Sequence, residues 1–353
     1  MPYSHTNTPL HAEQITKLKT LLNCQEIHFL TKQGGGNSVV LGIEADGRKW
    51  AVKSYPPYAP NQRDRLAAEL LVYQFLNQHS IPAVPQLKTY CEKERWLIIE
   101  WIDGEIPCEY STSDITQAIE FLSAIANLNV SATAINLPPA AEACLSLTIL
   151  LNQIEQRYQR LISLPAQDAV LTHFLLNEFY PLFEHYQKQA IEGYLTHKID
   201  PDAELPDAFR SLIPADFGFH NTIRDTSGKL YFFDFDYFGW DDPVKLLADI
   251  LWHPKMVFTE EQKKQFIAGL SDVYHKDPLF LSRFYYTWPL FGLRWVLILL
   301  NEFIPAFWLN RQHANVHQNQ TEAKKIQLGR AKKLLLNVQQ LGSPYEVIAA
   351  TSI

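Results

Sequence analysis

The first third of the chain alternates short apolar runs with turn-forming residues, a pattern typical of β-strands. Runs at residues 26–31, 38–45 and 49–55 are rich in β-branched or aromatic residues, and Ala-Asp-Gly between the last two predicts a hairpin turn. A further apolar run at 95–101 predicts a buried strand that ends at a turn. We therefore expect a small antiparallel sheet in this part of the chain.

Helical spacing of apolar positions is found at residues 63–79 and dominates after the sheet region. A helix is expected over 114–128, with Ser113 as a candidate N-cap. Short strands return only at 221–224 and 229–236, and a helical pattern resumes after them.

This order of elements predicts an α+β protein with two lobes. We expect an N-terminal lobe over residues 1–101, a hinge over 102–106 and a larger, mostly helical C-terminal lobe over 107–353. At 353 residues the chain exceeds the size at which a single hydrophobic core usually stops growing. A content of 47% apolar and 20% charged residues is globular.

The most apolar segment, residues 288–310, raises the question of a membrane span. Its uninterrupted apolar run covers only residues 295–300, whereas a spanning helix needs about 20 predominantly apolar residues. We therefore expect a buried helix here. The four cysteines show no C-x-x-C spacing and the N-terminus lacks the pattern of a signal peptide, so we interpret the chain as a cytoplasmic protein with reduced thiols.

The net charge of −7 is unevenly distributed. Residues 107–255 carry 9 basic and 20 acidic side chains, whereas residues 256–353 carry 11 and 7. No part of the chain shows a clear basic stripe, so we do not expect nucleic-acid binding. The acidic middle could attract metal ions or a cationic substrate, or it could be a solvated helical surface, and both interpretations stay open.

A group of oxygen-bearing side chains follows the helical middle of the chain. Asp216 is followed by Asn221 at the spacing D-x4-N, and Asp234 comes later, at the end of an apolar strand. Phosphoryl transfer uses a carboxylate that accepts the proton of the acceptor hydroxyl, together with an amide oxygen and a second carboxylate that hold magnesium. A loop and a hairpin could bring these three side chains together.

The letters Asp-Phe-Gly at 216–218 resemble the metal-binding motif of protein kinases, but their position argues against that role. If Asp216 held the metal, a D-x4-N pair should lie shortly upstream, and residues 195–215 contain none. Asp216 is therefore the candidate base and Asp234 the candidate metal ligand.

A possible nucleotide site lies in the N-terminal lobe. Glycines between the first two strands allow backbone N–H groups to approach a phosphate, although a glycine-rich turn without a ligand is the more common structure. Lys53, in the middle of a strand, and Glu69, on the following helix, form a suitable phosphate-positioning pair, unless Lys53 faces outward. The candidate residues of the glycine segment are Gly34, Gly35, Gly36, Asn37 and Ser38.

In this order the motifs resemble the aminoglycoside phosphotransferase and choline kinase family, relatives of the protein-kinase fold. The resemblance covers about residues 25–255 and is strongest in ADFGFHNTI and in LYFFDFDYFGWDDPVKLLADI. It implies a kinase that uses ATP and Mg²⁺, with Asp216 as the base, Asn221 and Asp234 on magnesium and Lys53 on the nucleotide phosphates.

The same resemblance extends to two further segments. IIEWIDGE resembles the family's hinge, which implies that the backbone at Glu100, Trp101 and Ile102 meets adenine. Asp249 would have a structural role in anchoring the catalytic loop. Asp236 lies two positions beyond Asp234, in the same segment.

The sequence departs from the family pattern beside the base. Pro214 and Ala215 stand where the family usually has His-Gly, which puts the geometry of the loop in doubt more than its chemistry. His220 stands where the family often has glycine, and we expect it to be packed in the loop rather than in contact with substrate.

Taken together, these features predict a phosphotransferase that acts on a hydroxyl of a small molecule. The positive charge of the final third favours a sugar or polysaccharide precursor over an aminoglycoside. A pseudokinase that binds nucleotide or a protein partner without transferring phosphate is the alternative, favoured by Pro214. The sequence gives no indication of the oligomeric state.

Overall fold

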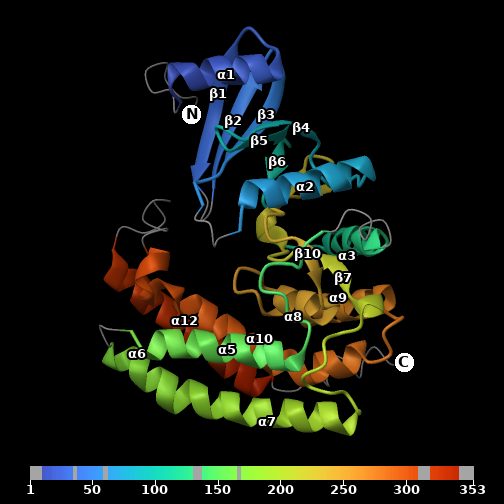
Figure 1. Cartoon of the computed structure of the whole chain (residues 1–353), viewed down its shortest axis with the longest axis vertical. Helices are drawn as coiled ribbons and strands as arrows, with labels where there is room; N and C mark the ends of the chain where they lie inside the picture. The colour runs from blue at the N-terminus through green and yellow to red at the C-terminus, as the bar shows by residue number, and fades with distance from the viewer. Residues whose placement is uncertain are drawn as a thin grey trace. The chain divides into compact units, whose positions relative to one another are not determined.

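The computed structural model describes residues 10–34, 38–58, 63–129, 137–164, 168–308 and 319–341. Contacts along the chain divide these residues into two compact units (Figure 1). The first unit comprises the described residues up to 108 together with 221–238. The second unit comprises residues 109–220 and the described residues from 239 onward.

A five-stranded antiparallel sheet forms the body of the first unit, with the strand order β1-β2-β3-β5-β4. The turn between β2 and β3 contains Asp46 and Gly47, with φ of 48° and 74°, as a two-residue hairpin with the right twist requires. The strands predicted at the four apolar runs are confirmed, whereas β4 was not predicted. The strands are β1 (Ile27–Gly34), β2 (Val39–Ala45), β3 (Arg48–Ser54), β4 (Leu87–Cys91) and β5 (Trp96–Glu100).

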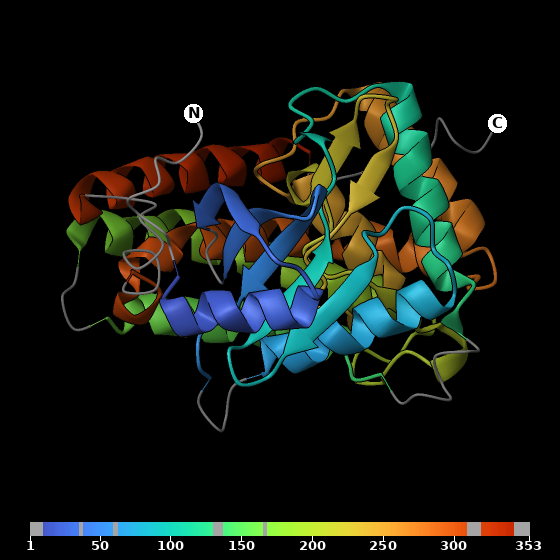
Figure 2. The same cartoon turned by 90° about the horizontal axis from the view of Figure 1, so that it is seen from above.

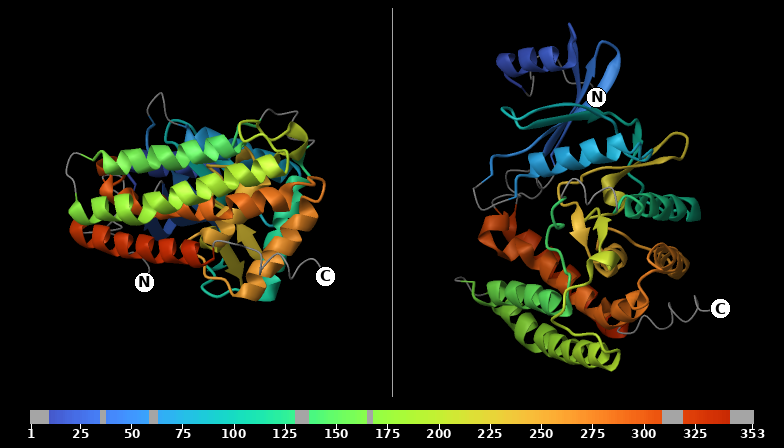
Figure 3. Two further views of the ribbon diagram at one scale, coloured as in Figure 1. Left: turned by 90° about the horizontal axis from the view of Figure 1, so that it is seen from below. Right: turned by 45° about the vertical axis from the view of Figure 1, so that its right-hand side comes forward.

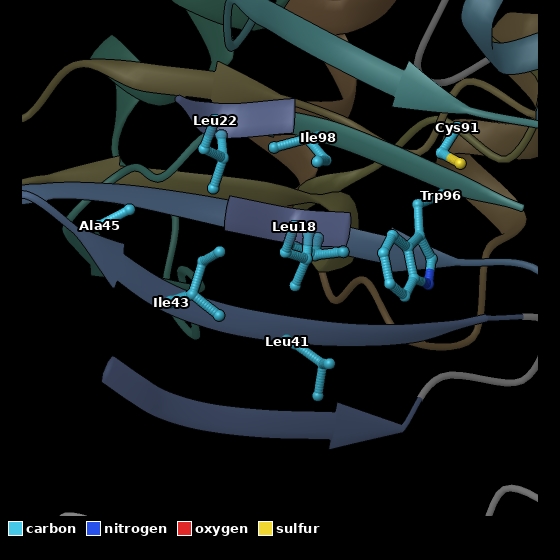
Figure 4. Packing of buried hydrophobic residues seen from close by; sticks show 9 residues of the cluster. Leu18, Leu22, Leu41, Ile43, Ala45, Cys91, Trp96 and Ile98 are labelled. Atoms are coloured by element: carbon cyan, nitrogen blue, oxygen red, sulfur yellow. The ribbon is translucent and has the colours of Figure 1, made fainter. Parts of the chain in front are cut away.

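Two helices cover opposite faces of this sheet: α1 (Ala12–Leu22) and α2 (Arg65–Gln78). Leu18 of α1 packs with Val52 and other apolar side chains in a buried cluster, several of which Figure 4 shows on one face of the strands. Because successive residues of a strand face opposite sides, Lys53 lies on the other face, where it contacts Glu69 of α2. Helix α1 was not predicted, and α2 agrees with the helical pattern at residues 63–79.

A second, three-stranded sheet belongs to the same unit, with the order β6-β8-β9. Its strands are β6 (Gly104–Glu105), β8 (Thr222–Asp225) and β9 (Leu230–Phe232). The backbone N–H of Phe232 donates to the carbonyl of Ala83 at 2.8 Å, which fixes this sheet to the segment after α2. The strand predicted over 229–236 is therefore too long, because β9 ends at Phe232 and the following residues leave the sheet.

The second unit is mostly helical. Helix α10 packs against α5, α7, α8 and α12, and α3 packs against α9 (Figures 2 and 3). Strands β7 (Ser211–Ile213) and β10 (Gly239–Asp241) pair in a two-stranded sheet that was not predicted. The helices are α3 (Thr112–Ala126), α5 (Leu147–Ile162), α6 (Ala169–His173), α7 (Tyr180–Thr196), α8 (Pro243–Trp252), α9 (Glu260–Val273), α10 (Phe280–Leu299) and α12 (Gln320–Gln340).

Helix α3 begins at Thr112, two residues earlier than the predicted start at residue 114. Its N-cap is Ser111, whose hydroxyl accepts from the N–H of Asp114 while the carboxylate of Asp114 accepts from the N–H of Ser111. The prediction of Ser113 as N-cap was wrong because this reciprocal pair satisfies two backbone donors, which Ser113 does not do.

The apolar segment around residue 295 forms part of α10, a buried helix, as expected. It carries two buried arginines: Arg283 is bonded to Asp242 and Asp277, and Arg294 to Asp249. Among the described residues, the helices are all too short or too polar to cross a membrane.

Candidate active site

Lys53 occupies the centre of a buried ionic cluster in the first unit. Its ammonium group lies 2.6 Å from Oε2 of Glu69 and also donates to Oδ1 of Asp234. Burial alone would lower the pKa of Lys53, but the negative charges of these two carboxylates outweigh burial and raise that pKa above its ordinary value. Lys53 therefore faces inward as a stable cation, and the alternative of an outward-facing residue is excluded.

Glu69 connects three segments of the chain. One carboxylate oxygen accepts from Lys53 and from the hydroxyl of Tyr55, and the other accepts from the backbone N–H of Phe235 at 3.1 Å. Strand β3, helix α2 and the segment after β9 thus meet at one buried side chain. The role of Tyr55 was not predicted. The spacing could have indicated it, because residues two positions apart in an extended chain, such as Lys53 and Tyr55, point to the same side.

Asp234 lies two residues beyond the end of β9, in a left-handed backbone conformation with φ of 70°. Aspartate tolerates this conformation better than most residues. About a third of its side chain is exposed, so one carboxylate can meet both Lys53 and a ligand from solution.

Asp236 is buried and accepts from the guanidinium of Arg65 at 2.7 Å. Burial, together with the charges of Asp234 and Glu69, raises the pKa of Asp236 to about 7. The charge of Arg63 also acts on Asp236, so the three carboxylates of this cluster face three cations among the described residues. Of the three carboxylates, only that of Asp234 is partly exposed and can meet a metal ion from solution.

Asn221 lies beside this cluster, because its backbone carbonyl accepts from the N–H of Phe233 at 3.2 Å. Carboxylate and amide oxygens are the ligand types that Mg²⁺ prefers. The donor set of Asn221 and Asp234 therefore fits magnesium.

The predicted base, Asp216, belongs to the second unit. It follows β7 after two residues and, like Asp234, has a left-handed backbone, with φ of 66°. Oδ1 of Asp216 lies 3.5 Å from Nε2 of His220 and 3.5 Å from Nε2 of His253. Partial desolvation favours the neutral acid, but the two imidazole rings beside the carboxylate outweigh it and hold the pKa of Asp216 well below its ordinary value.

Both histidines are packed rather than open to solvent. Their rings are stacked, with centroids 4.3 Å apart and an interplanar angle of 12°. His220 thus agrees with the expectation of a packed loop residue. His253 was missed, because no feature of its sequence neighbourhood indicates that it meets a residue so distant in the chain.

Among the described residues, Asp249 forms no hydrogen bond or ion pair with the loop that carries Asp216. Its partners are Lys245 in α8 and Arg294 and Trp295 in α10. Its structural role is therefore to join these two helices, and it reaches the base only through Trp295, whose ring packs against His253.

The candidate nucleotide residues are only partly described. Gly34 ends β1 and Ser38 directly precedes β2, whereas Gly35, Gly36 and Asn37 lie outside the described residues.

In the predicted hinge, residues 101–103 follow β5 without strand pairing. The carboxylate of Glu100 accepts from the N–H of Gln86 at 3.2 Å, and the indole of Trp101 donates to Asp103 at 3.1 Å. A Cβ atom on Gly42 would lie 2.7 Å from the Trp101 ring, so only glycine leaves room for this indole beside the sheet.

A family model described as the phosphotransferase enzyme family matches residues 32–284, which is most of the chain. The chain belongs to this family. It is therefore a phosphotransferase, a small-molecule kinase, and the predicted resemblance is confirmed. No curated protein is similar to the chain in sequence at a significant level.

Solved structures of low sequence identity share the fold over nearly the whole chain. A choline/ethanolamine kinase family protein from Mesorhizobium loti is 15% identical with a TM-score of 0.56, and covers 93% of this chain and 98% of its own. A choline kinase from Cryptosporidium parvum is 13% identical with a TM-score of 0.58, covering 94% and 97%. A spectinomycin phosphotransferase in complex with ADP and spectinomycin is 13% identical with a TM-score of 0.59, covering 95% and 100%. These similarities confirm the α+β kinase-like fold.

Proposed function

We propose that this phosphotransferase transfers the γ-phosphate of ATP to a hydroxyl group of a small molecule, in a reaction that depends on Mg²⁺. One observation carries the proposal: Lys53 is held between Glu69 and Asp234 in a buried cluster. A lysine fixed in this way is how kinases place the nucleotide phosphates beside a metal-binding aspartate.

Within this proposal each group of residues has one task. Lys53 contacts the nucleotide phosphates, while Glu69 and Tyr55 hold its ammonium in place. Asn221 and Asp234 would hold magnesium, which when bound neutralises negative charge on the phosphates. Asp216 accepts the proton of the acceptor hydroxyl.

The proposed nucleotide site also includes the glycine segment and the segment that follows β5. The glycine segment from Gly34 to Ser38 would cover the phosphates, and the backbone of residues 100–102 would meet adenine. We further propose that residues 1–101 act as the nucleotide-binding lobe, 102–106 as the hinge and 107–353 as the lobe that binds the acceptor.

For the acceptor we favour a neutral or anionic compound, such as a sugar or a precursor of a polysaccharide. The side chains found against Asp216 are two imidazoles, and His253 in turn packs on the indole of Trp295. Imidazole and indole groups pair with hydroxyl groups and sugar rings, whereas a polycation is bound best by several carboxylates. The positive balance of residues 256–353 supports the same preference.

The proposal is tested by measuring ADP release and product formation with a panel of acceptors: monosaccharides, choline, ethanolamine and aminoglycosides. We expect turnover with a sugar, and a loss of about 10²- to 10⁴-fold in kcat for Asp216→Asn with ATP binding retained. Unchanged turnover in Asp216→Asn would reject the assignment of the base. Tight nucleotide binding without turnover across the whole panel would instead support a pseudokinase.

A further inference from the structure

The side chain of His253 is fixed at the end of α8, where the residue is the C-cap. It is buried, and its Nδ1 accepts a hydrogen bond from the backbone N–H of Lys255 at 3.2 Å. A nitrogen that accepts from an N–H carries a lone pair, so the proton of the neutral imidazole lies on Nε2. Nε2 is the nitrogen that faces Oδ1 of Asp216.

Burial keeps His253 in this neutral form. Desolvation lowers the pKa of His253 below its ordinary value, and the hydrogen bond to Asp216 only partly offsets that effect. The imidazole is therefore an N–H donor toward the carboxylate of Asp216 at neutral pH.

Packing from two sides holds the ring at its position. On one face His253 stacks on His220, and on another it meets the indole of Trp295 edge-on, with centroids 4.6 Å apart. The indole N–H of Trp295 donates to Asp249 at 2.8 Å, and Asp249 is bonded in turn to Arg294. The orientation of His253 is thus determined by α8 and α10 together with His220, which lies in the loop that carries Asp216.

Two histidines and a carboxylate could in principle hold a transition metal, but the ring geometry argues against it. A metal bound to imidazole lies close to the plane of the ring, along the nitrogen lone pair. The rings of His220 and His253 are nearly parallel, at 12°, and are stacked one above the other. One ion cannot lie in both planes, so this cluster is better suited to holding the carboxylate of Asp216.

We propose that His253 is a positioning residue for the base: its Nε2–H donates to Oδ1 of Asp216 and fixes the orientation of that carboxylate for the acceptor hydroxyl. This inference rests on the proposed role of Asp216. The present separation of 3.5 Å is long for a hydrogen bond, and hydrogen bonds at catalytic groups often shorten when the substrate binds. His220 stacks on His253, and its own Nε2 lies equally 3.5 Å from Oδ1 of Asp216.

The two nitrogens of His253 can be tested separately. His253→Gln can place an amide N–H near the position of Nε2, whereas His253→Asn can accept from Lys255 but leaves no donor near Asp216. His253→Phe keeps an aromatic ring and removes both nitrogens. His197→Phe is the matched control, because His197 is the C-cap of α7, its Nδ1 lies 3.0 Å from a backbone carbonyl and its ring packs on Tyr286.

The readout is the kinetics of ATP turnover with the best acceptor of the panel, or with water where none is found. We expect His253→Asn and His253→Phe to lower kcat about 10- to 100-fold without changing the KM for ATP. His253→Gln should recover most of this loss, and His197→Phe should leave kcat unchanged. Melting temperatures identify any variant that is unfolded at the assay temperature. If His253→Phe is unfolded, the difference in kcat between His253→Asn and His253→Gln tests the inference.

A double variant separates positioning from a general structural effect. Once Asp216→Asn has removed the carboxylate, adding His253→Asn should cost nothing further in kcat, because the two side chains act as one unit. Additive losses, or a His253→Asn variant as active as the wild type, would overturn the inference and leave the assignment of Asp216 intact. If Asp216→Asn itself retains full turnover, the proposed function fails first.

Discussion

Glu69 accepts hydrogen bonds from the side chains of Lys53 and Tyr55 and from the backbone of Phe235. Burial raises the pKa of Glu69, but the adjacent ammonium of Lys53 opposes that effect. The carboxylate thus holds both the cation proposed to meet the phosphates and the segment that carries Asp234.

Glu69→Gln tests this role with almost no change in volume. The amide can still accept from Phe235, but Lys53 loses one of its two counter-ions, the fully buried one. Removing one partner of a buried pair can cost about 3–5 kcal/mol, and we expect a smaller loss because Asp234 remains. ATP affinity should also fall. Chemical denaturation and nucleotide titration measure both effects, with Tyr55→Phe as a control expected to cost only about 1 kcal/mol.

At this scale the sequence indicates residues whose type is unusual for their position. A lysine in the middle of a strand and an aspartate after an apolar strand conflict with their apolar surroundings, so Lys53 and Asp234 could be predicted. His253 could not, because its importance depends on a contact with Asp216 that no local pattern encodes.

At the scale of elements, glycine decides how closely two helices of the second unit approach. A Cβ atom on Gly193 in α7 would lie 2.2 Å from the ring of Tyr286 in α10. A Cβ on Gly329 in α12 would meet no atom within 4 Å. A Gly→Ala substitution should therefore have opposite effects on the stability of the protein at the two positions.

We expect Gly193→Ala to destabilise the protein by about 1–3 kcal/mol, because the methyl group must displace an aromatic ring in a packed core. Gly329→Ala should stabilise it by about 0.5–1 kcal/mol, because alanine loses less conformational entropy in a helix. Denaturant unfolding of the two variants beside the wild type measures both. Equal effects at the two positions would show that α7 and α10 can separate at no cost.

An element could be predicted from the sequence where it has a pattern of its own. Strands β2 and β3 and helix α2 have clear periods and clear turn residues, so they could be predicted from the sequence. Strand β4 and the pair of β7 and β10 could not, because they are short and are stabilised by their strand partners rather than by a pattern of their own. Strand β9 ends early because the chain must turn at Asp234, where φ is positive.

At the scale of the whole molecule, the proposed nucleotide and metal residues belong to one unit and the proposed base to the other. Asn221 follows His220 directly in the sequence, so the chain passes from the base to the metal residues within a few positions. The two groups can therefore be altered independently. Asp234 should control nucleotide binding, while Asp216 and His253 should control only turnover.

This separation predicts how ligands change the melting temperature. Mg²⁺ with a non-hydrolysable ATP analogue at 100-fold its Kd should stabilise the wild type by about 2.7 kcal/mol. Excess EDTA should remove most of this stabilisation, since the phosphates then face the carboxylate cluster without a metal ion. Asp234→Ala should lose the stabilisation even with Mg²⁺ present, and His253→Asn should retain it, because its side chain lies with Asp216 in the second unit. Stabilisation that survives both EDTA and Asp234→Ala would mean that the nucleotide binds elsewhere, and that the buried cluster around Lys53 serves only the stability of the fold.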